Sequence, residues 1–261
     1  KYEDPEYSIT QTPLNEQDLK TMSEAVEVLR QFKGFSYFTE MSDIINRLED
    51  HVASARMKTT PVIDFEKNES LKGLDYLDTI YHAIVNEHPI QLKYRSFKAR
   101  SANSFIFYPY LLKEYRNRWF VYGVRGNGRI LQNLALDRIQ SLEVLPQEHY
   151  IKNTFFDPNT FFDDLVGVTK NTGSVAEKVG FKVAAAEAPY IITKPIHRSQ
   201  QVMERLADGS VILEIEVVIN HELERVFFGY AEGIQVLYPK TLVELMGRKL
   251  KKAAEQYTHS K

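Results

Sequence analysis

Cationic and aromatic side chains are interleaved along one stretch of the chain, residues 91–139, called the basic segment below. It holds ten Lys and Arg residues and only two acidic ones, a net charge of +8, whereas the whole chain carries −2. Cations bind phosphate oxygens, and the rings between them offer faces on which bases stack. Like charges crowded into one region also repel each other, and a bound polyanion relieves that repulsion. The pattern therefore favours a phosphate-bearing ligand.

The candidate binding residues are those of the basic segment whose side chains suit such a ligand. Arginine can hold phosphate oxygens through two parallel hydrogen bonds, and Tyr or Phe rings can contact bases or sugar edges. Asp137 is expected to orient Arg138, because a carboxylate facing a phosphate is repelled. The candidates are Tyr94, Arg95, Tyr108, Lys113, Arg116, Arg118, Phe120 and Arg138. The plainer alternative is a barrel with Lys and Arg at its outward positions and aromatic residues in its core. A core role is expected for Trp119.

Other chemistries have weaker support in the sequence. With no cysteine, the chain has no disulfide, thiolate metal site or cysteine nucleophile. Residues 221–225 open like a helical zinc-protease motif, but Arg225 stands where the second His ligand belongs, so we expect the start of a solvated helix. His197 and Ser199 are two residues apart, too close to face each other along one strand, and are expected in a polar loop. No pattern indicates a metal or cofactor.

The elements that must position the basic segment follow from its periodicity. Apolar residues at helical spacing predict an amphipathic helix over 71–85. Alternation then predicts strands at 90–95, 105–112, 118–124, 129–136 and 139–145, with a hairpin turn at 126–128. One helix followed by about five short strands is typical of a small, strongly bent sheet or barrel.

The regions before residue 71 and beyond residue 155 have sequence patterns that differ from that of the basic segment. Before residue 71 the pattern predicts two helices, at about 12–33 and 39–51, and then a connector. Beyond residue 155 it predicts a helix at 157–165, strands at 181–183, 211–219 and 234–237, and helices at 222–230 and from Pro239 onward. The last helix has one apolar stripe, formed by Leu242, Leu245, Met246, Leu250, Ala253 and Tyr257. This order predicts a small α+β sandwich.

The motifs of the basic segment resemble those of WYL-domain proteins. Trp119-Phe120-Val121 stands where that family carries Trp-Tyr-Leu, and Leu136-Asp137-Arg138-Ile139 looks like its closing motif. Residues 92–95 and 109–111 resemble its first two strands, and the part from about residue 155 resembles the C-terminal WCX extension. The chain departs from the family at Phe120, which replaces Tyr, and at Ala135, where many members have Arg.

The resemblance implies an α+β fold: a helical linker at 1–70, an Sm-like WYL β-barrel at 71–150 and a WCX-like α+β domain at 151–261. It implies the sensing part of a bacterial transcriptional regulator, whose barrel binds a nucleotide or single-stranded nucleic acid effector. It further implies a homodimer, and promoter DNA bound through a winged helix-turn-helix that is not evident upstream of residue 71. Since no signal peptide or membrane-spanning run is recognisable, we expect a cytoplasmic protein.

The sequence is also compatible with two other functions. The barrel and the C-terminal part could form a dimerisation module without a small ligand, which an exposed apolar face on the last helix would favour. A nuclease-type enzyme would need clustered carboxylates for a metal, and Asp163-Asp164 is the single adjacent aspartate pair in the sequence.

Overall fold

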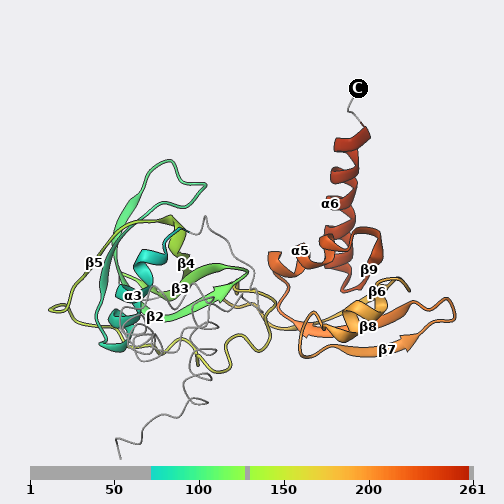
Figure 1. Cartoon of the computed structure of the whole chain (residues 1–261), viewed down its shortest axis with the longest axis horizontal. Coiled ribbons are helices and arrows are strands. Elements are labelled where there is room, and N and C mark those ends of the chain that lie inside the picture. Colours follow the sequence, from blue (N-terminus) through green and yellow to red (C-terminus); the bar gives the residue numbers. More distant parts are fainter. Residues whose placement is uncertain (1–71, 127–129, 259–261) are drawn as a thin grey trace, which may run out of the picture. The chain divides into compact units, whose positions relative to one another are not determined.

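The computed structural model describes residues 72–126 and 130–258, which form an α+β structure with two antiparallel sheets (Figure 1). The helices predicted at 12–33 and 39–51 lie outside the described residues, as does most of the turn at 126–128. Residue contacts divide the chain into two units. The first holds the described residues up to Val121 together with Leu134–Ile151, and the second holds Tyr122–Asn133 and the described residues from Lys152 onward.

Five strands form the first sheet, in the order β4-β3-β2-β1-β5. A short 3-10 helix and a longer helix precede them, η4 (Leu74–Tyr76) and α3 (Leu77–Val85). The strands are β1 (Ile90–Tyr94), β2 (Asn103–Tyr115), β3 (Arg118–Arg125), β4 (Leu131–Ala135) and β5 (Ile139–Val144), and the 3-10 helix η5 (Leu136–Arg138) joins β4 to β5. The amphipathic helix and the five strands predicted from periodicity are thus present, with strand bounds within three residues of those predicted.

Helix α3 covers the apolar face of this sheet. Leu77, Ile80 and Ala83 recur at every third position, and all three are buried, as the helical period requires. They share a core with buried strand residues such as Phe107, and Trp119 packs against the same core. The core role expected for Trp119 is therefore confirmed.

The connection between β4 and β5 bends the first sheet. These strands lie at opposite ends of the strand order, yet only the three residues of η5 separate them in sequence. A 3-10 helix rises about 2 Å per residue, so the two edges come within roughly 10 Å of each other where η5 passes between them. The sheet is strongly curled, as predicted. The strand pairing found among the described residues does not close it into a barrel, so the predicted Sm-like barrel is not confirmed.

Gly73 lets η4 approach η5. Its φ is +81°, and a Cβ atom at this position would lie 2.4 Å from the carbonyl carbon and oxygen of Leu136. No side chain fits such a gap without moving the backbone of η5. Glycine is therefore required here by both its dihedral angle and its lack of a side chain.

The second sheet has four strands in the order β7-β8-β6-β9. The strands are β6 (Glu177–Val183), β7 (Gln201–Arg205), β8 (Val211–Val217) and β9 (Ile234–Tyr238). The helices of this part are α4 (Ala188–Thr193), α5 (His221–Gly229), the 3-10 helix η6 (Ala231–Gly233) and α6 (Lys240–Thr258). Strand β8 pairs antiparallel with both β7 and β6, and β6 pairs antiparallel with β9.

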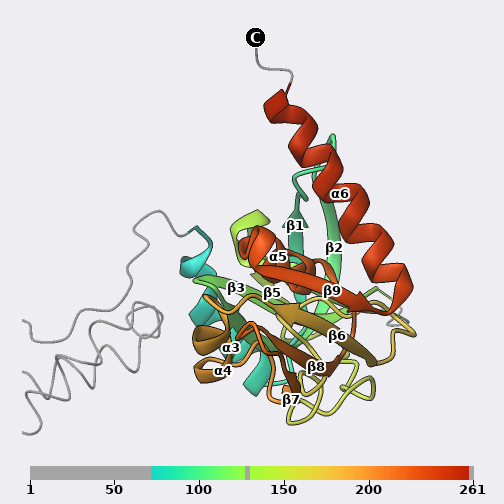
Figure 2. The same ribbon diagram turned by 90° about the vertical axis from the view of Figure 1, so that its right-hand side faces the viewer.

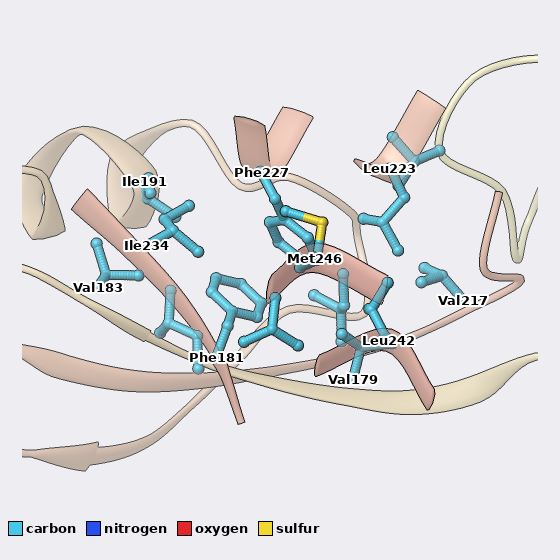
Figure 3. Close-up of a cluster of buried hydrophobic side chains, with 14 of the residues drawn as sticks. Val179, Phe181, Val183, Ile191, Val217, Leu223, Phe227, Ile234, Leu242 and Met246 are labelled. Atoms are coloured by element: carbon cyan, nitrogen blue, oxygen red, sulfur yellow. The ribbon is translucent and has the colours of Figure 1, made fainter. Parts of the chain in front are cut away.

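One face of the second sheet carries its core (Figure 3). Alternate residues of β6, Val179, Phe181 and Val183, are fully buried, and the Phe181 ring lies 5.1 Å from the Phe227 ring of α5, centroid to centroid. Residues of α4 and α6 join this cluster. Helices packed on one face of an antiparallel sheet match the α+β arrangement predicted for this part.

Helix α6 is covered along its first half alone. Leu242 and Met246 are buried, whereas every residue from Gly247 to Thr258 is exposed. The second half extends beyond the sheet that the first half covers (Figures 1 and 2). Leu250 is 41% exposed and Tyr257 is 86% exposed, so the predicted apolar stripe continues onto a surface that the described residues leave open.

Tyr122 and Asn133, from β3 and β4, belong to the second unit and contact other residues of that unit. The Tyr122 hydroxyl donates a hydrogen bond to the Val168 carbonyl oxygen, and Asn133 Nδ2 donates to the same oxygen at 2.7 Å. Burial raises the pKa of Tyr122 far above its usual value. Its ring also contacts three neighbouring rings, those of Phe156, Phe161 and Phe162.

The prediction of a helix at 157–165 is wrong, because this segment forms successive turns. The Asp157 carboxylate accepts the Asn159 backbone N–H at 2.9 Å, a local bond that competes with helix formation. Strand β7 and helix α4 are absent from the prediction. All five residues of β7 are exposed, so the strand has no apolar alternation, and α4 is only six residues long.

The start of α5 is less solvated than predicted. Asn220 caps the helix by accepting the Leu223 backbone N–H at 2.9 Å, as a good N-cap residue does. Glu222 is 5% exposed, and its Oε1 accepts a hydrogen bond from the Thr169 hydroxyl at 2.8 Å. Gly167 leaves the space that the Glu222 side chain fills.

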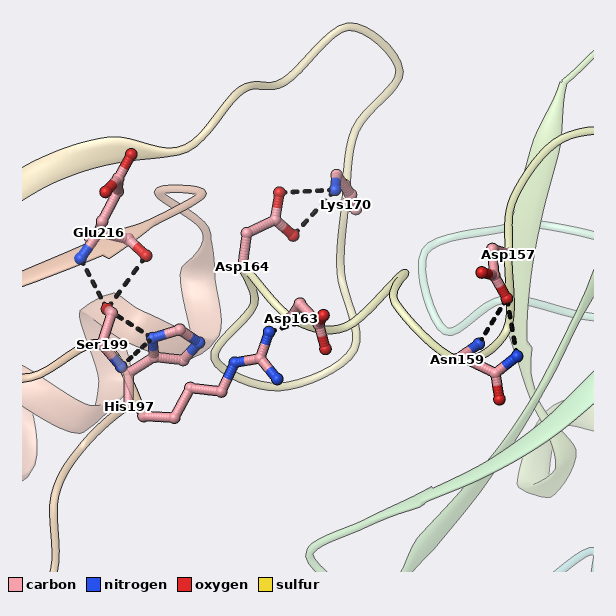
Figure 4. A network of polar contacts seen from close by, with 9 residues as sticks. Asp157, Asn159, Asp163, Asp164, Lys170, His197, Ser199 and Glu216 are labelled. Carbon is pink, nitrogen blue, oxygen red and sulfur yellow. Dashed lines mark hydrogen bonds and ion pairs between the residues drawn. The ribbon is translucent and has the colours of Figure 1, made fainter.

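The loop between α4 and β7 is held by His197 and Ser199 (Figure 4), and here the prediction that they do not face each other is wrong. Nδ1 of His197 lies 2.8 Å from Oγ of Ser199 and accepts the Ser199 backbone N–H at 3.2 Å. Residues 194–200 form a loop, as expected, and in a loop two residues so close in the sequence can turn toward each other. Burial lowers the pKa of His197 below its usual value, and the Arg198 guanidinium acts in the same direction.

Replacing Gly73 by Ala should destabilise the protein more than replacing Gly173, which has the same φ of +81° but nothing within 4 Å of the place that a Cβ atom would occupy. The positive φ alone costs an Ala residue about 1–2 kcal/mol. The clash with Leu136 should add about 2 kcal/mol or more at Gly73→Ala, in the range of overpacking effects. Urea unfolding of both variants measures their free energies of unfolding. Equal losses of stability would contradict the close approach of Gly73 to Leu136.

Acidification should destabilise the protein through His197. The folded protein takes up this proton less readily than the unfolded chain, so the contribution of His197 is fully present above about pH 6.5, the usual His pKa, and is lost as the pH falls below it. The melting temperature should therefore fall less between pH 7.5 and pH 5.5 for His197→Gln than for the parent protein. His149→Gln, at an exposed position, is the control, and an unchanged difference in His197→Gln would count against this account.

Candidate ligand-binding site

One carboxylate holds two arginines of the first unit side by side. Asp137, in η5, has its Oδ2 atom 3.3 Å from Nε of Arg118, the first residue of β3. Its Oδ1 atom lies 3.8 Å from Nε of Arg138, the next residue in η5. The Asp137 side chain is only 15% exposed, whereas that of Arg118 is 48% exposed. The carboxylate is thus more covered than either arginine side chain, of which that of Arg138 is 27% exposed.

Tyr94 and Arg95 belong to the same cluster. Tyr94 ends β1 and is opposite Ile139 in the ladder with β5, next to a bulge. Burial raises the pKa of its hydroxyl, although the adjacent Arg138 guanidinium and a hydrogen bond with the Ala135 backbone favour the ionised form. The Arg95 backbone N–H donates to the Arg138 carbonyl oxygen at 3.1 Å. Four of the eight candidate residues, Tyr94, Arg95, Arg118 and Arg138, are thus brought together.

Two atoms at the centre of this cluster have unused hydrogen-bonding capacity. Among the described residues, Asp137 Oδ1 and Arg138 Nε are buried atoms without a hydrogen-bond partner. Their separation of 3.8 Å permits an electrostatic attraction but exceeds hydrogen-bond length. Buried polar atoms are nearly always hydrogen-bonded, so these two atoms are an exception within the part of the chain that the structure describes.

Phe97 is a member of the cluster that the sequence reasoning missed. The Arg138 guanidinium carbon lies 4.5 Å from the centroid of the Phe97 ring, and Phe97 is 73% exposed. It lies in the turn between β1 and β2, where no strand or helix period exists to predict its direction. Its one signal in the sequence is its place between the cations Arg95 and Lys98.

The other four candidate residues have no described contact with Asp137. Tyr108, on β2, has its ring 6.1 Å from that of Tyr150, which also contacts Tyr110. Burial raises the pKa of Tyr110 to about 12. The described contacts do not place Tyr108 within the Asp137 cluster.

The remaining three candidates lie on or beside β3 and on β2. Lys113 is half-buried on β2. Arg116 is in the two-residue turn between β2 and β3, where φ is +49°, and its guanidinium lies 5.5 Å from the Tyr115 ring centroid. Phe120 is half-buried two residues after Arg118. Since side chains alternate along a strand, Phe120 shares the face of β3 that Arg118 occupies, opposite Trp119.

The two carboxylates considered for a nuclease are each paired with a cation (Figure 4). Asp163 Oδ2 lies 2.6 Å from Arg198 Nη2, and Asp164 Oδ2 lies 2.7 Å from Lys170 Nζ. Within residues 72–126 and 130–258, no group of three or more His, Asp or Glu side chains is arranged to hold a metal ion. The same residues include no helix of the length and apolar character needed to cross a membrane.

Comparison with known protein families gives two matches to parts of the chain. Residues 75–144 match the WYL domain, and residues 176–254 match the WCX domain. The basic segment lies entirely within the first match. No curated protein matches the chain.

Two solved structures are similar along most of the chain. Proteasome accessory factor B/C (PafBC) of Arthrobacter aurescens is 16% identical over 90% of this chain and 34% of its own, with a TM-score of 0.34. A CRISPR Cas-related protein is 11% identical over 97% of this chain and 89% of its own, with a TM-score of 0.47. The chain thus spans about a third of the length of the PafBC structure. The resemblance found in the sequence motifs is confirmed by the two family matches: the chain carries a WYL domain followed by a WCX domain.

Proposed function

We propose that this chain is the effector-sensing part of a bacterial transcriptional regulator and that its WYL domain binds a nucleotide or a short single-stranded nucleic acid. A WYL domain followed by a WCX domain fits a regulatory sensing module. In this proposal the bound state is passed to a DNA-binding domain that contacts the promoter. The ligand is held by the Asp137 cluster.

The observation that carries the proposal is the arrangement of Arg118 and Arg138 around Asp137. Two guanidinium groups from separate elements are held in place by a shared carboxylate before any ligand binds. Guanidinium groups bind phosphate oxygens strongly because their N–H groups match the geometry of the anion.

The surroundings of the cluster favour a single strand or a nucleotide over a duplex. Exposed aromatic residues can stack only on bases that are not already stacked and paired within a helix. Phe97 is such a residue beside Arg138, and Phe120 shares a strand face with Arg118. The +8 charge of the basic segment would add a salt-dependent attraction to any phosphate backbone.

An enzymatic function receives less support. A metal-dependent nuclease needs carboxylates free to coordinate a metal, and Asp163 and Asp164 are instead paired with Arg198 and Lys170. The two matched domains also fit a regulatory module better than an enzyme.

Replacing Arg138 by Ala should weaken binding of a short single-stranded DNA about tenfold or more, because a charge-assisted hydrogen bond contributes about 1.5–3 kcal/mol. The slope of log affinity against log salt should also become shallower by about 0.7, the contribution of one phosphate contact in a single strand. Fluorescence anisotropy with a labelled oligonucleotide at several salt concentrations measures both quantities.

The matched control is Arg205→Ala, which removes the same charge from an exposed position on β7. It should leave affinity within about twofold of the parent protein, as expected for a long-range effect screened by salt. Equal losses of affinity in the two variants would indicate binding by a diffuse basic surface and not by a defined site. Affinity independent of salt would contradict the electrostatic part of the proposal.

A second candidate function is self-association, and the exposed half of α6 favours it. An isolated helix of this length is marginal in water without a packing partner. Leu250, Ala253 and Tyr257 lie on one face at helical spacing and continue the stripe of the buried Met246. The small Ala253 between two larger residues would let a second helix approach closely. A stable dimer buries upwards of about 1,000 Å², so this stripe would form part of a larger interface.

The intact chain should therefore be a dimer in light scattering at micromolar concentration, and Leu250→Glu combined with Tyr257→Glu should make it a monomer. The introduced carboxylates would be buried without a partner, which is strongly unfavourable. Lys251→Glu places the same residue type on the other side of the helix and should leave the dimer intact. A monomeric parent protein, or a dimer that survives the double replacement, would rule out this interface.

A further inference from the structure

We propose that Phe97 is the residue on which the base of the ligand stacks, while Arg138 holds the neighbouring phosphate. The inference rests on the function proposed above for the same site, and it identifies the recognised unit as a purine nucleotide, free or within a single strand. It goes beyond the basic residues of the cluster by assigning the base to a ring outside the strands.

The turn that carries Phe97 is fixed to the arginine beside it. The Ala99 backbone N–H donates to the Ser96 carbonyl oxygen at 3.0 Å, which closes a turn with Phe97 and Lys98 at its centre. Arg95 Nε also reaches the Ala99 carbonyl oxygen, at 3.4 Å. The backbone N–H of Arg95 donates to the carbonyl oxygen of Arg138. The ring and the guanidinium are thus positioned by one set of backbone contacts.

The ring is held on one side and open elsewhere. The Arg138 guanidinium lies 4.5 Å from the ring centroid, which is the distance of a cation–π contact on one face. Phe97 nevertheless remains 73% exposed, whereas the Arg138 side chain is only 27% exposed. A large apolar ring in this position covers part of an arginine and leaves most of its own surface in water.

The two groups can act on one nucleotide without competing. A guanidinium is flat, and its N–H groups point outward in its plane. An N–H group of Arg138 can therefore bind a phosphate oxygen while the guanidinium stays over the Phe97 ring. A base stacked on the exposed part of the ring would cover apolar surface, and because the ring is already fixed, little conformational entropy would be lost on binding. Purines have the larger stacking surface, which favours them over pyrimidines.

The test compares AMP, ribose 5-phosphate and a short oligo(dA) as probes, with affinities measured by calorimetry on the full chain. The parent protein should bind AMP more tightly than ribose 5-phosphate, which has the phosphate but no base. Phe97→Ala should weaken AMP binding about five- to a hundredfold, the range for one base–aromatic stack, and leave ribose 5-phosphate binding unchanged. Phe97→Tyr should bind AMP as the parent does, because it retains the ring.

Phe97→Leu separates stacking from simple covering of Arg138. Leucine keeps an apolar side chain over the guanidinium but offers no ring, so it should lose AMP affinity as Phe97→Ala does. Full AMP affinity in Phe97→Leu, or equal losses of AMP and ribose 5-phosphate in Phe97→Ala, would overturn the assignment of the base to Phe97. Because Phe97 is exposed, all variants should melt at the parent temperature, which thermal unfolding checks.

The oligo(dA) arm distinguishes a free nucleotide from a strand as the source of the same chemistry. Tighter binding of oligo(dA) than of AMP, with the same loss in Phe97→Ala, assigns the site to a strand, and tighter AMP binding assigns it to a free nucleotide. If the parent protein binds none of the three probes, the proposed function fails together with this inference. Binding by the parent protein with no effect of Phe97→Ala overturns the inference alone.

Discussion

The three residues of η5 impose the constraint on which the first unit depends. They connect strands at the two ends of a five-stranded order, so the sheet has to curl until its edges meet at that point. Curling brings the start of β3, the end of β1 and η5 itself into one small volume. Arg118 and Arg138 are 20 positions apart in the sequence, yet both contact Asp137. The short connection is thus the physical cause of the charge cluster.

Two cations this close would repel each other strongly without Asp137. A carboxylate that is 15% exposed interacts with them through a medium less polar than bulk water, so its attraction is screened less than that of a surface ion pair. Three charges that sum to +1 still leave the site attractive to an anion. The same carboxylate restricts the rotamers of both arginines, and less entropy is then lost when they bind a ligand. Removing Asp137 would therefore increase the net charge of the site while loosening it.

The sequence predicted the elements of the first unit well because alternation and helical period record which face is buried. It placed Trp119 in the core and Asp137 beside Arg138, both from local pattern. The sequence could not predict that Arg118 contacts Asp137. That contact depends on the order of the strands in the sheet, which alternation along single strands does not reveal. Phe97 lies in a turn without any period. The bond between His197 and Ser199 depends on a loop path that no strand argument describes.

The second unit shows the same limits. Strand β7 has no buried residue, so nothing in its pattern distinguishes it from a loop. The segment 157–165 has apolar residues at helical spacing, but its rings pack on Tyr122 and its Asp157 side chain bonds locally. Exposure of Leu250 and Tyr257 could not be read from the stripe alone, because an amphipathic helix has the same pattern whether its face is covered by its own domain or by another molecule.

Strand β3 contributes residues to both units, so no single cut in the sequence separates the two units. Its first half packs with α3, whereas Tyr122 bonds to Val168 and is surrounded by Phe156, Phe161 and Phe162. A chain shortened to end between residues 144 and 152 would keep all five strands of the first sheet but expose the Tyr122 ring and leave its hydroxyl without the Val168 oxygen. Each family match is continuous in sequence, but the parts that pack together are interleaved, so the WYL domain expressed alone would carry a newly exposed aromatic surface prone to aggregation.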